Sequence, residues 1–315
     1  MIPLDPIVLF FLLGLLAGLG RSDLRLPGSI YEFLSVILLL AIGLKGGVEL
    51  AQQSVTVLLP QMAAVIVMGF VLPLAAYPVL RGLGRLARAD AASIAAHYGS
   101  VSVGTYAVAV AWLVSRGIHF EEYMPLLLVL LEMPAIVVGI LLARGISAGT
   151  DWKALTHEVF LGKSIVLLGG GLLIGWAAGP AALEPVGGLF FGLFHGVLAL
   201  FLLEMGLVAA GQVSSLRRHG VFLVAFGITF PLFGAAVGGS LGWLLGLSPG
   251  GTMLLAVLAA SASYIAVPAA MRLALPEANP ALSLTAALGV TFPFNILVGL
   301  PLYHQWAGLL HSLGG

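Results

Sequence analysis

The chain of 315 residues has no cysteine and very few charged residues. Without cysteine it forms no disulfide, no thiolate nucleophile and no cysteine-ligated metal site. Asp, Glu, Lys and Arg together make up 8% of the chain, whereas a soluble domain carries about 25%. So few solvated groups cannot cover a globular surface. A soluble enzyme, a nucleic-acid-binding protein and a disordered scaffold are therefore excluded, and the formal net charge of zero indicates no polyanionic partner.

What the chain has in abundance is apolar sequence, at 60% of its residues. A membrane-spanning helix needs about 20 apolar residues, so this length accommodates about ten of them. Backbone in contact with lipid must satisfy its hydrogen bonds internally, and each apolar run therefore predicts a helix. We predict an all-α membrane protein. The ten runs lie near residues 6–20, 30–50, 56–80, 90–114, 122–143, 159–179, 187–211, 219–247, 252–274 and 281–311.

The basic residues predict the orientation of these helices, because cytoplasmic loops carry an excess of Lys and Arg. Eleven of the thirteen basic residues are assigned to the side of the loops after predicted helices 1, 3, 5, 7 and 9, and the opposite side holds only Lys45 and Arg116. We therefore expect the first helix to be retained and to start outside, and both termini to face away from the cytoplasm. The eleven are Arg21, Arg25, Arg81, Arg85, Arg88, Arg144, Lys153, Lys163, Arg217, Arg218 and Arg272.

Four pairs of segments repeat in the same order at an offset of about 160 residues. Chance similarity among Leu-, Gly- and Ala-rich helices is the alternative, but four matches at one offset favour a real repeat. Each half holds five predicted helices, an odd number, so the halves are inverted in the bilayer, as in many secondary transporters. The pairs are 39–47 with 202–210, Pro73 with Pro231, 99–105 with 260–266, and 130–140 with 288–300.

Predicted helices 4 and 9 are interrupted by small polar residues at equivalent depths. Gly, Ser and Pro loosen the helical ladder, and a broken helix within a membrane is tolerated where it is buried in protein or lines a cavity. Half-helix N-termini there suit a small anion. The alternative is that the hydroxyls bond back within continuous helices. The residues of this predicted substrate site are Ser100, Ser102, Gly104, Thr105, Ser261, Ser263 and Tyr264.

A carboxylate within a membrane helix marks a second candidate site. Glu132 lies in the middle of predicted helix 5, shortly before Pro134. Its counterpart in the repeat is Thr291, followed by Asn295. Carboxylate, hydroxyl and carbonyl oxygens are the ligands that a small cation prefers. We predict that Glu132, Thr291 and Asn295 bind a coupling cation; the alternative is a protonated Glu132 bonded in the core.

The chain has no nucleophile elbow, no Walker loop and no cluster of transition-metal ligands. We therefore predict a protein without enzymatic activity and without a cofactor other than a sodium ion as the coupling ion. The expected surroundings are membrane lipid and a small anion substrate.

Four segments of the chain resemble one known family. They are IGLKGG (42–47), GSVSVGT (99–105), AASASYIAVPAAMR (259–272) and LPEANP (275–280). In this order they resemble the sodium-dependent bicarbonate transporter family known from cyanobacteria, over nearly the whole chain. The resemblance implies ten helices in two inverted five-helix repeats. Bicarbonate and sodium would be held between broken helices 4 and 9, in a homotrimer in the bacterial inner membrane.

The resemblance also implies two domains, each assembled from both repeats. A gate domain would contain helices 1, 2, 6 and 7, in residues 1–55 and 150–216. A core domain would contain helices 3–5 and 8–10, in residues 56–149 and 217–315. Ser102, Thr105, Ser261 and Ser263 match polar positions of the family's binding segments, and Glu132 stands where the family has Asp.

The chain departs from the family pattern in and near the second break. Tyr264 replaces an acidic residue, and Ala262 and Ala266 lack hydroxyls of the family. Tyr264 either supplies a neutral hydroxyl to the anion, with weaker sodium dependence, or packs between core helices with its hydroxyl on a backbone carbonyl. The linker at 144–158 is shorter than the cyanobacterial cytoplasmic loop, which argues against regulation by a PII-like protein.

Several functions are compatible with these features. The first is sodium-coupled uptake of bicarbonate or a similar small anion. The second is transport of larger organic anions by the same architecture, and the third is passive anion conduction. A membrane scaffold or sensor is a fourth, but paired broken helices would have no purpose in it.

Overall fold

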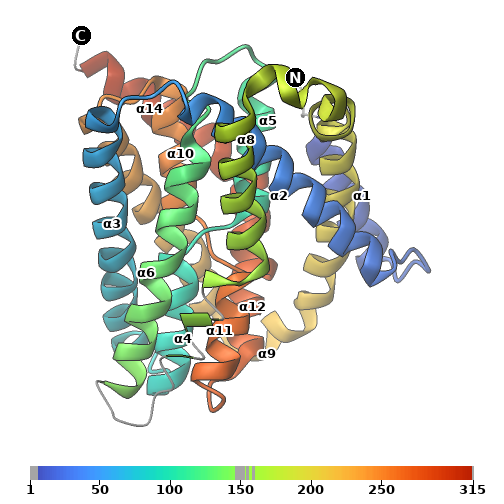
Figure 1. Cartoon of the computed structure of the whole chain (residues 1–315). Helices are drawn as coiled ribbons and strands as arrows, with labels where there is room; N and C mark the ends of the chain where they lie inside the picture. The colour runs from blue at the N-terminus through green and yellow to red at the C-terminus, as the bar shows by residue number, and fades with distance from the viewer. Residues whose placement is uncertain (1–5, 146–152, 154–155, 158–159, 314–315) are drawn as a thin grey trace.

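The computed structural model describes residues 6–145, 153, 156–157 and 160–313, and the chain is helical in this part (Figure 1). Most of the linker at 144–158 and residues 1–5 lie outside the described residues. The first half contains α1 (Pro6–Leu19), α2 (Gly28–Leu50), α3 (Val55–Gly82), α4 (Arg88–Gly99), α5 (Val103–Val114) and α6 (Met124–Arg144). The second half contains α8 (Lys163–Gly187), α9 (Phe194–Leu244), α10 (Pro249–Ala259), α11 (Ala266–Ala274), α12 (Pro280–Leu284), α13 (Phe292–Phe294) and α14 (Leu300–Leu313), with π-helical η1 (Gly188–Gly192), η2 (Thr285–Thr291) and η3 (Asn295–Gly299).

Six stretches of the described chain are long and apolar enough to cross a membrane. The helices at Pro6–Leu19 and Pro249–Ala259 are apolar but shorter. The chain is therefore a multi-pass, all-helical membrane protein, while ten spans and an inverted repeat stay predictions. The six stretches are Gly28–Leu50, Val55–Gly82, Met124–Arg144, Lys163–Val213, Gly220–Leu244 and Pro280–Leu313.

Two glycines turn the chain inside elements that are otherwise hydrogen-bonded as one helix. Gly179 in α8 has φ 70° and ψ 173°, and Gly220 in α9 has φ 83° and ψ 172°. A straight helix of the 51 residues of α9 would measure about 77 Å, more than twice the thickness of a bilayer core. Positive φ at Gly220 folds α9 into two helices, because glycine adopts this conformation without a steric penalty. The predicted division at residues 211–219 falls at this turn.

One region of the molecule is built from helices in close pairs, which are regular apart from the turn at Gly179 in α8. We call α1, α2, α8 and the part of α9 before Gly220 the paired-helix region. Here α2 packs along α8, and α1 packs along α9 (Figure 1). A Cβ atom added to Gly171 would lie 3.0 Å from the Gly43 Cα, and one added to Gly175 would lie 3.1 Å from the Gly47 Cα. Glycine thus lets the two backbones of α2 and α8 touch.

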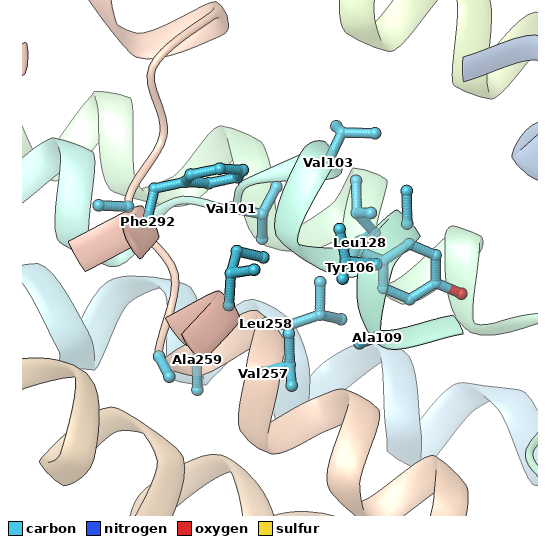
Figure 2. Close-up of a cluster of buried hydrophobic side chains, with 14 of the residues drawn as sticks. Val101, Val103, Tyr106, Ala109, Leu128, Val257, Leu258, Ala259 and Phe292 are labelled. Carbon is cyan, nitrogen blue, oxygen red and sulfur yellow. The ribbon is translucent and has the colours of Figure 1, made fainter. Parts of the chain in front are cut away.

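The remainder of the molecule contains the interrupted helices. We call α3–α6, the part of α9 after Gly220, and residues 249–313 the broken-helix region. In it α3 packs on α4 and α6, and the second part of α9 packs on α10 and η2. Figure 2 shows side chains from both halves in one apolar cluster, with Val101 and Val103 near Leu258 and Phe292.

The last predicted helix, at 281–311, is one helical stretch with two π-helical sections, η2 and η3. These flank α13, which contains Pro293. Proline has no backbone N–H to donate, so the ladder around it widens instead of continuing as a regular α-helix.

Candidate functional site

The first break separates α4 from α5 at residues 100–102, where polar residues interrupt the fourth apolar run. Ser102 is the N-cap of α5: its Oγ accepts from the Thr105 backbone N–H at 3.1 Å and from the Thr105 hydroxyl at 2.8 Å. An N-cap serine replaces a missing helical partner in this way. Because Ser102 Oγ accepts both bonds, its own proton is left to donate. Ser100 Oγ donates to the Glu132 backbone carbonyl at 3.4 Å.

The second break, at residues 260–265, separates α10 from α11 and repeats this arrangement. Ser263 Oγ accepts from the Val267 backbone N–H of α11 at 3.4 Å, and the Ser263 backbone N–H donates to the His97 carbonyl of α4 at 2.8 Å. The second break is therefore hydrogen-bonded to α4, the helix that leads into the first break. Ser261 differs from Ser263, because its Oγ donates to the Val257 carbonyl of α10 at 2.6 Å. Ser261 thus shows the back-bonding that was the alternative for both clusters.

A narrow crevice lies between the two breaks. It is lined by Ser102 and its neighbours Val101 and Val103, by the segment Ser263–Ile265, and by Glu132 of α6 and Ser164 of α8. Its polar lining is buried: the exposed fraction is 1% for Glu132 and 2% for Ser164. The structure thus brings predicted residues of both breaks together with the predicted carboxylate.

Three buried polar atoms around this crevice have no hydrogen-bond partner in the described part of the chain. They are Glu132 Oε2, Ser164 Oγ and the Tyr264 hydroxyl oxygen. Burying a polar group without a partner is unfavourable, and native proteins keep such groups mostly where a ligand, ion or water completes them. Three of them on one crevice indicate a binding site.

Three helix N-termini also meet at the crevice. The N-termini of α5, α11 and α8 contribute Ser102, Ile265 and Ser164 to its lining or to the adjoining cavity. The N-caps of α11 and α8 are Ile265 and Gly162, which make no side-chain capping bond. In α11 the Val267 N–H is bonded to Ser263 Oγ, and the other first-turn N–H groups of α11 and α8 have no side-chain cap from the N-cap residue. Together with the positive ends of the helix dipoles, they favour an anion.

Tyr264 fills the side of the crevice next to α5. Its ring packs edge-on against Phe292 with centroids 5.7 Å apart. A Cβ atom on Gly104 would collide with the Tyr264 hydroxyl, so Gly104 is required for this close approach. The ring thus packs against its neighbours, and its hydroxyl lies beside the Gly104 backbone and the Ser102 side chain at the polar crevice.

Thr291 and Asn295 do not line the crevice in which Glu132 lies. Thr291 Oγ1 donates to the Gly227 carbonyl at 2.7 Å and lies 2.6 Å from the Tyr98 hydroxyl. Asn295 Nδ2 donates to the Ala260 carbonyl at 2.9 Å, and Asn295 Oδ1 accepts from Tyr303 at 2.7 Å. Asn295 thereby satisfies a carbonyl that the second break leaves without a helical partner. Thr291 and Asn295 thus form hydrogen bonds with other residues and do not line the crevice together with Glu132.

Ser164 is a site residue that the sequence did not reveal. It lies in the first turn of α8, in the paired-helix region, and lines the crevice opposite the breaks. The only sequence signal is a single serine at the start of an apolar run, which many membrane helices share. Its position depends on how α8 packs against α6, and no local pattern encodes that.

A cavity of about 140 Å³ adjoins the crevice on one side. Ser164 and Ile265 line both, and Lys163, Ile136, Ala266 and Ala269 complete the larger one. A separate pocket of about 250 Å³ lies between α2, α5 and η1. Lys45 and Glu122 line that pocket and form an ion pair at 2.9 Å.

Interrupted helices around a buried polar crevice, in an all-helical membrane protein, are features of a membrane transporter. The family model of the Na+-dependent bicarbonate transporter superfamily matches residues 6–308. The chain belongs to this family, and the resemblance predicted from its four segments is confirmed. A search of curated proteins found no match to the chain.

Proposed function

We propose that the protein is a secondary active transporter that takes up bicarbonate, or a similar small anion, together with sodium across the bacterial cytoplasmic membrane. The observation that carries this proposal is the crevice between the two breaks. There Glu132 Oε2, Ser164 Oγ and the Tyr264 hydroxyl are buried without partners. A transport step needs no covalent chemistry, and we propose none.

The anion is bound by the groups that the breaks leave free. The hydroxyl protons of Ser102 and Ser263 are available, since both oxygens already accept bonds from the helix that follows. The N-termini of α5, α11 and α8 add N–H groups and positive dipole ends. Bicarbonate offers three oxygens to such donors. The crevice is closed around its polar groups in this structure, so binding requires the two breaks to move apart.

The sodium ion binds at the carboxylate of Glu132, which supplies the negative charge that a buried cation requires. Tyr264 stands where the family has an acidic residue and contributes no charge, so sodium binding is weaker than in typical members. Thr291 and Asn295 belong to the predicted cation site. Since both make other hydrogen bonds, the cation depends mainly on Glu132.

The packing of the two regions supports an inverted repeat. In an inverted repeat α1 corresponds to α8, and α2 corresponds to the first part of α9. The contact between α1 and α9 then has the contact between α8 and α2 as its counterpart, and both contacts are present. The same correspondence relates the contacts among α3, α4 and α6 to those among the second part of α9, α10 and residues 280–313. We propose that the paired-helix region is the gate and the broken-helix region is the core.

The test is uptake of radiolabelled bicarbonate by proteoliposomes with and without an inward sodium gradient. Accumulation above equilibrium that a sodium ionophore abolishes supports a symporter. Equilibration without accumulation identifies a passive channel instead, and inhibition by larger carboxylic acids identifies an organic-anion carrier. Homotrimeric assembly, both termini outside, and the doubtful role of a PII-like partner stay predictions.

A further inference from the structure

A second polar cavity lies within the broken-helix region, away from the crevice. It has a volume of about 140 Å³ and lies between α4, α11 and residues 275–283. Its mouth includes the exposed Arg272, and its interior includes Ser93, His97 and Ser283, which are 3%, 1% and 1% exposed. The cavity is therefore cationic where it opens and polar where it is buried.

His97 presents a hydrogen-bond acceptor at the buried end of this cavity. Its Nδ1 lies 2.7 Å from the Ser93 backbone carbonyl. Because a carbonyl only accepts, Nδ1 carries the proton, and Nε2 of the neutral ring has a free lone pair. Nε2 is buried and has no partner in the described residues. A buried acceptor in this state requires a donor from a ligand or water.

Two other side chains of the cavity, those of Arg272 and Ser93, can donate to a ligand, whereas Ser283 Oγ already donates to the Pro280 carbonyl at 3.2 Å. Arg272 makes no ion pair with any carboxylate in the described part of the chain. Ser93 lies one helical turn before His97, and its hydroxyl makes no hydrogen bond within the described residues. A guanidinium binds oxyanions through paired N–H groups. The cavity thus combines two donors that suit an anion, Arg272 and Ser93, with the unpartnered acceptor His97 Nε2, which requires a proton from the ligand.

We propose that this cavity is a second binding site, for a small oxyanion that carries a hydroxyl proton. Arg272 and Ser93 donate to the anionic oxygens, and the hydroxyl of the ligand donates to His97 Nε2. Bicarbonate and hydrogen phosphate share this chemistry. Nitrate has the planar shape of bicarbonate but no proton, so it leaves His97 Nε2 unpaired.

His97 connects this site to the transport site. Its backbone carbonyl accepts the hydrogen bond from the Ser263 N–H that holds the second break against α4. An anion that binds the His97 ring therefore contacts the residue whose backbone carbonyl holds Ser263 in place. The cytoplasmic location of the cavity rests on the proposed orientation, in which Arg272 faces the cytoplasm. In that orientation the site senses the anion on the side to which it is delivered.

The test is equilibrium binding of radiolabelled bicarbonate to the purified full-length protein in a closed vessel. We expect two sites per chain. Arg272→Gln weakens one of them about tenfold or more, since a hydrogen bond to a charged group is lost. Ser93→Ala weakens the same site while keeping the carbonyl that holds His97. The double variant Ser102→Ala with Ser263→Ala weakens the other site. Arg85→Gln, at a basic residue that does not line the cavity, is the matched control.

Competing anions then define the ligand class. Phosphate and bicarbonate each displace the label from the site that Arg272→Gln weakens, and the relative concentrations identify the preferred anion. Nitrate displaces it at least about tenfold less well, because it offers no proton to His97. Equal displacement by nitrate, or unchanged binding in both Arg272→Gln and Ser93→Ala, overturns the proposal. If instead proteoliposomes show no uptake while the site that depends on Arg272 still binds, the transport proposal fails and this one stands.

Discussion

The paired-helix region and the broken-helix region differ in how they satisfy their backbone hydrogen bonds, which must be made within the protein in a membrane. In the paired-helix region the backbone bonds to itself along its helices, and glycines such as Gly43 and Gly175 let neighbouring helices touch. In the broken-helix region the chain leaves the helical conformation twice. Serines and an asparagine, Ser102, Ser263 and Asn295, supply the missing partners.

This difference suggests different roles for the two regions: the paired-helix region supports the fold, and the broken-helix region offers groups that can bind a ligand. A helix that satisfies all its own N–H groups has none to offer a ligand, and it can serve as a rigid wall. A helix interrupted in mid-membrane presents free N–H groups and hydroxyl protons at one place. Only Ser164, at the first turn of α8, brings the paired-helix region to the crevice. Substitutions that affect one region and not the other test this difference.

The largest effect is expected for Gly175→Val in the paired-helix region. A Cβ there would lie 3.0 Å from the Leu44 carbonyl carbon and 3.1 Å from the Gly47 Cα. Backbone atoms cannot move aside, so α2 and α8 separate and the protein loses about 1–3 kcal/mol or more of stability. Thermal unfolding followed by size-exclusion chromatography measures this. Gly169→Val is the control on the same helix, because nothing lies within 4 Å of its Cβ position. Equal destabilisation by both variants would show that close helix contact is unimportant.

Glu132→Gln is expected to have the next largest effect, and on transport instead of folding. The amide keeps the shape of the side chain and removes its charge, so the sodium concentration for half-maximal uptake rises about tenfold or more. Uptake at varied sodium concentration, normalised to the amount of folded protein, gives the measurement. A sodium response like that of the unaltered protein would show that Glu132 is a buried, protonated residue without a role in coupling.

Serine substitutions at the breaks test which hydroxyls bind the anion. Ser102→Ala and Ser263→Ala each remove a free hydroxyl proton from the crevice, so the KM for the anion rises up to about tenfold. Ser261→Ala removes a hydroxyl that already donates to Val257, so it changes the KM little. Initial uptake rates of the three variants decide this. The distinction is wrong if Ser261→Ala impairs uptake as much as the other two.

The smallest effect is expected at the ion pair that joins the two regions. Lys45 and Glu122 are 2.9 Å apart, with side chains 47% and 39% exposed. An exposed pair of this kind contributes about 0.2–1 kcal/mol. A double-mutant cycle of Lys45→Met and Glu122→Gln, followed by thermal unfolding, should give a coupling in this range that shrinks at high salt. A larger coupling, insensitive to salt, would mean that the two regions are held together at this pocket.

The positions of both breaks could be predicted from the sequence, because their cause is local. Gly99, Ser100 and Ser102 weaken one helix, and Ser261, Ser263 and Pro268 weaken the other. The turn at Gly179 falls where one predicted apolar run ends, and the turn at Gly220 falls where another begins. Helix existence and interruption follow from short stretches of sequence, and these expectations agree with the structure.

The contents of the site were less predictable, because they depend on contacts between distant residues. Asn295 was predicted in the cation site because it follows Thr291, the counterpart of Glu132 in the repeat. In the structure its Nδ2 donates to the carbonyl of Ala260, 35 residues away along the chain. Ser164 enters the crevice only because α8 packs beside α6. Ser261 and Ser263 look equivalent in the sequence, and only the backbone path at the break shows which hydroxyl is free.

The turn at Gly220 has a mechanical consequence. It is the point at which α9 leaves the paired-helix region and enters the broken-helix region, with no loop between the two parts. A displacement of one region against the other must therefore be absorbed by rotation about the backbone bonds near this residue. Gly220 is therefore the hinge between the two helical parts of α9, and the range of its φ and ψ angles limits the rotation of one part against the other. A residue with a Cβ at this position would restrict the hinge, because a φ of 83° is sterically disfavoured for any residue other than glycine.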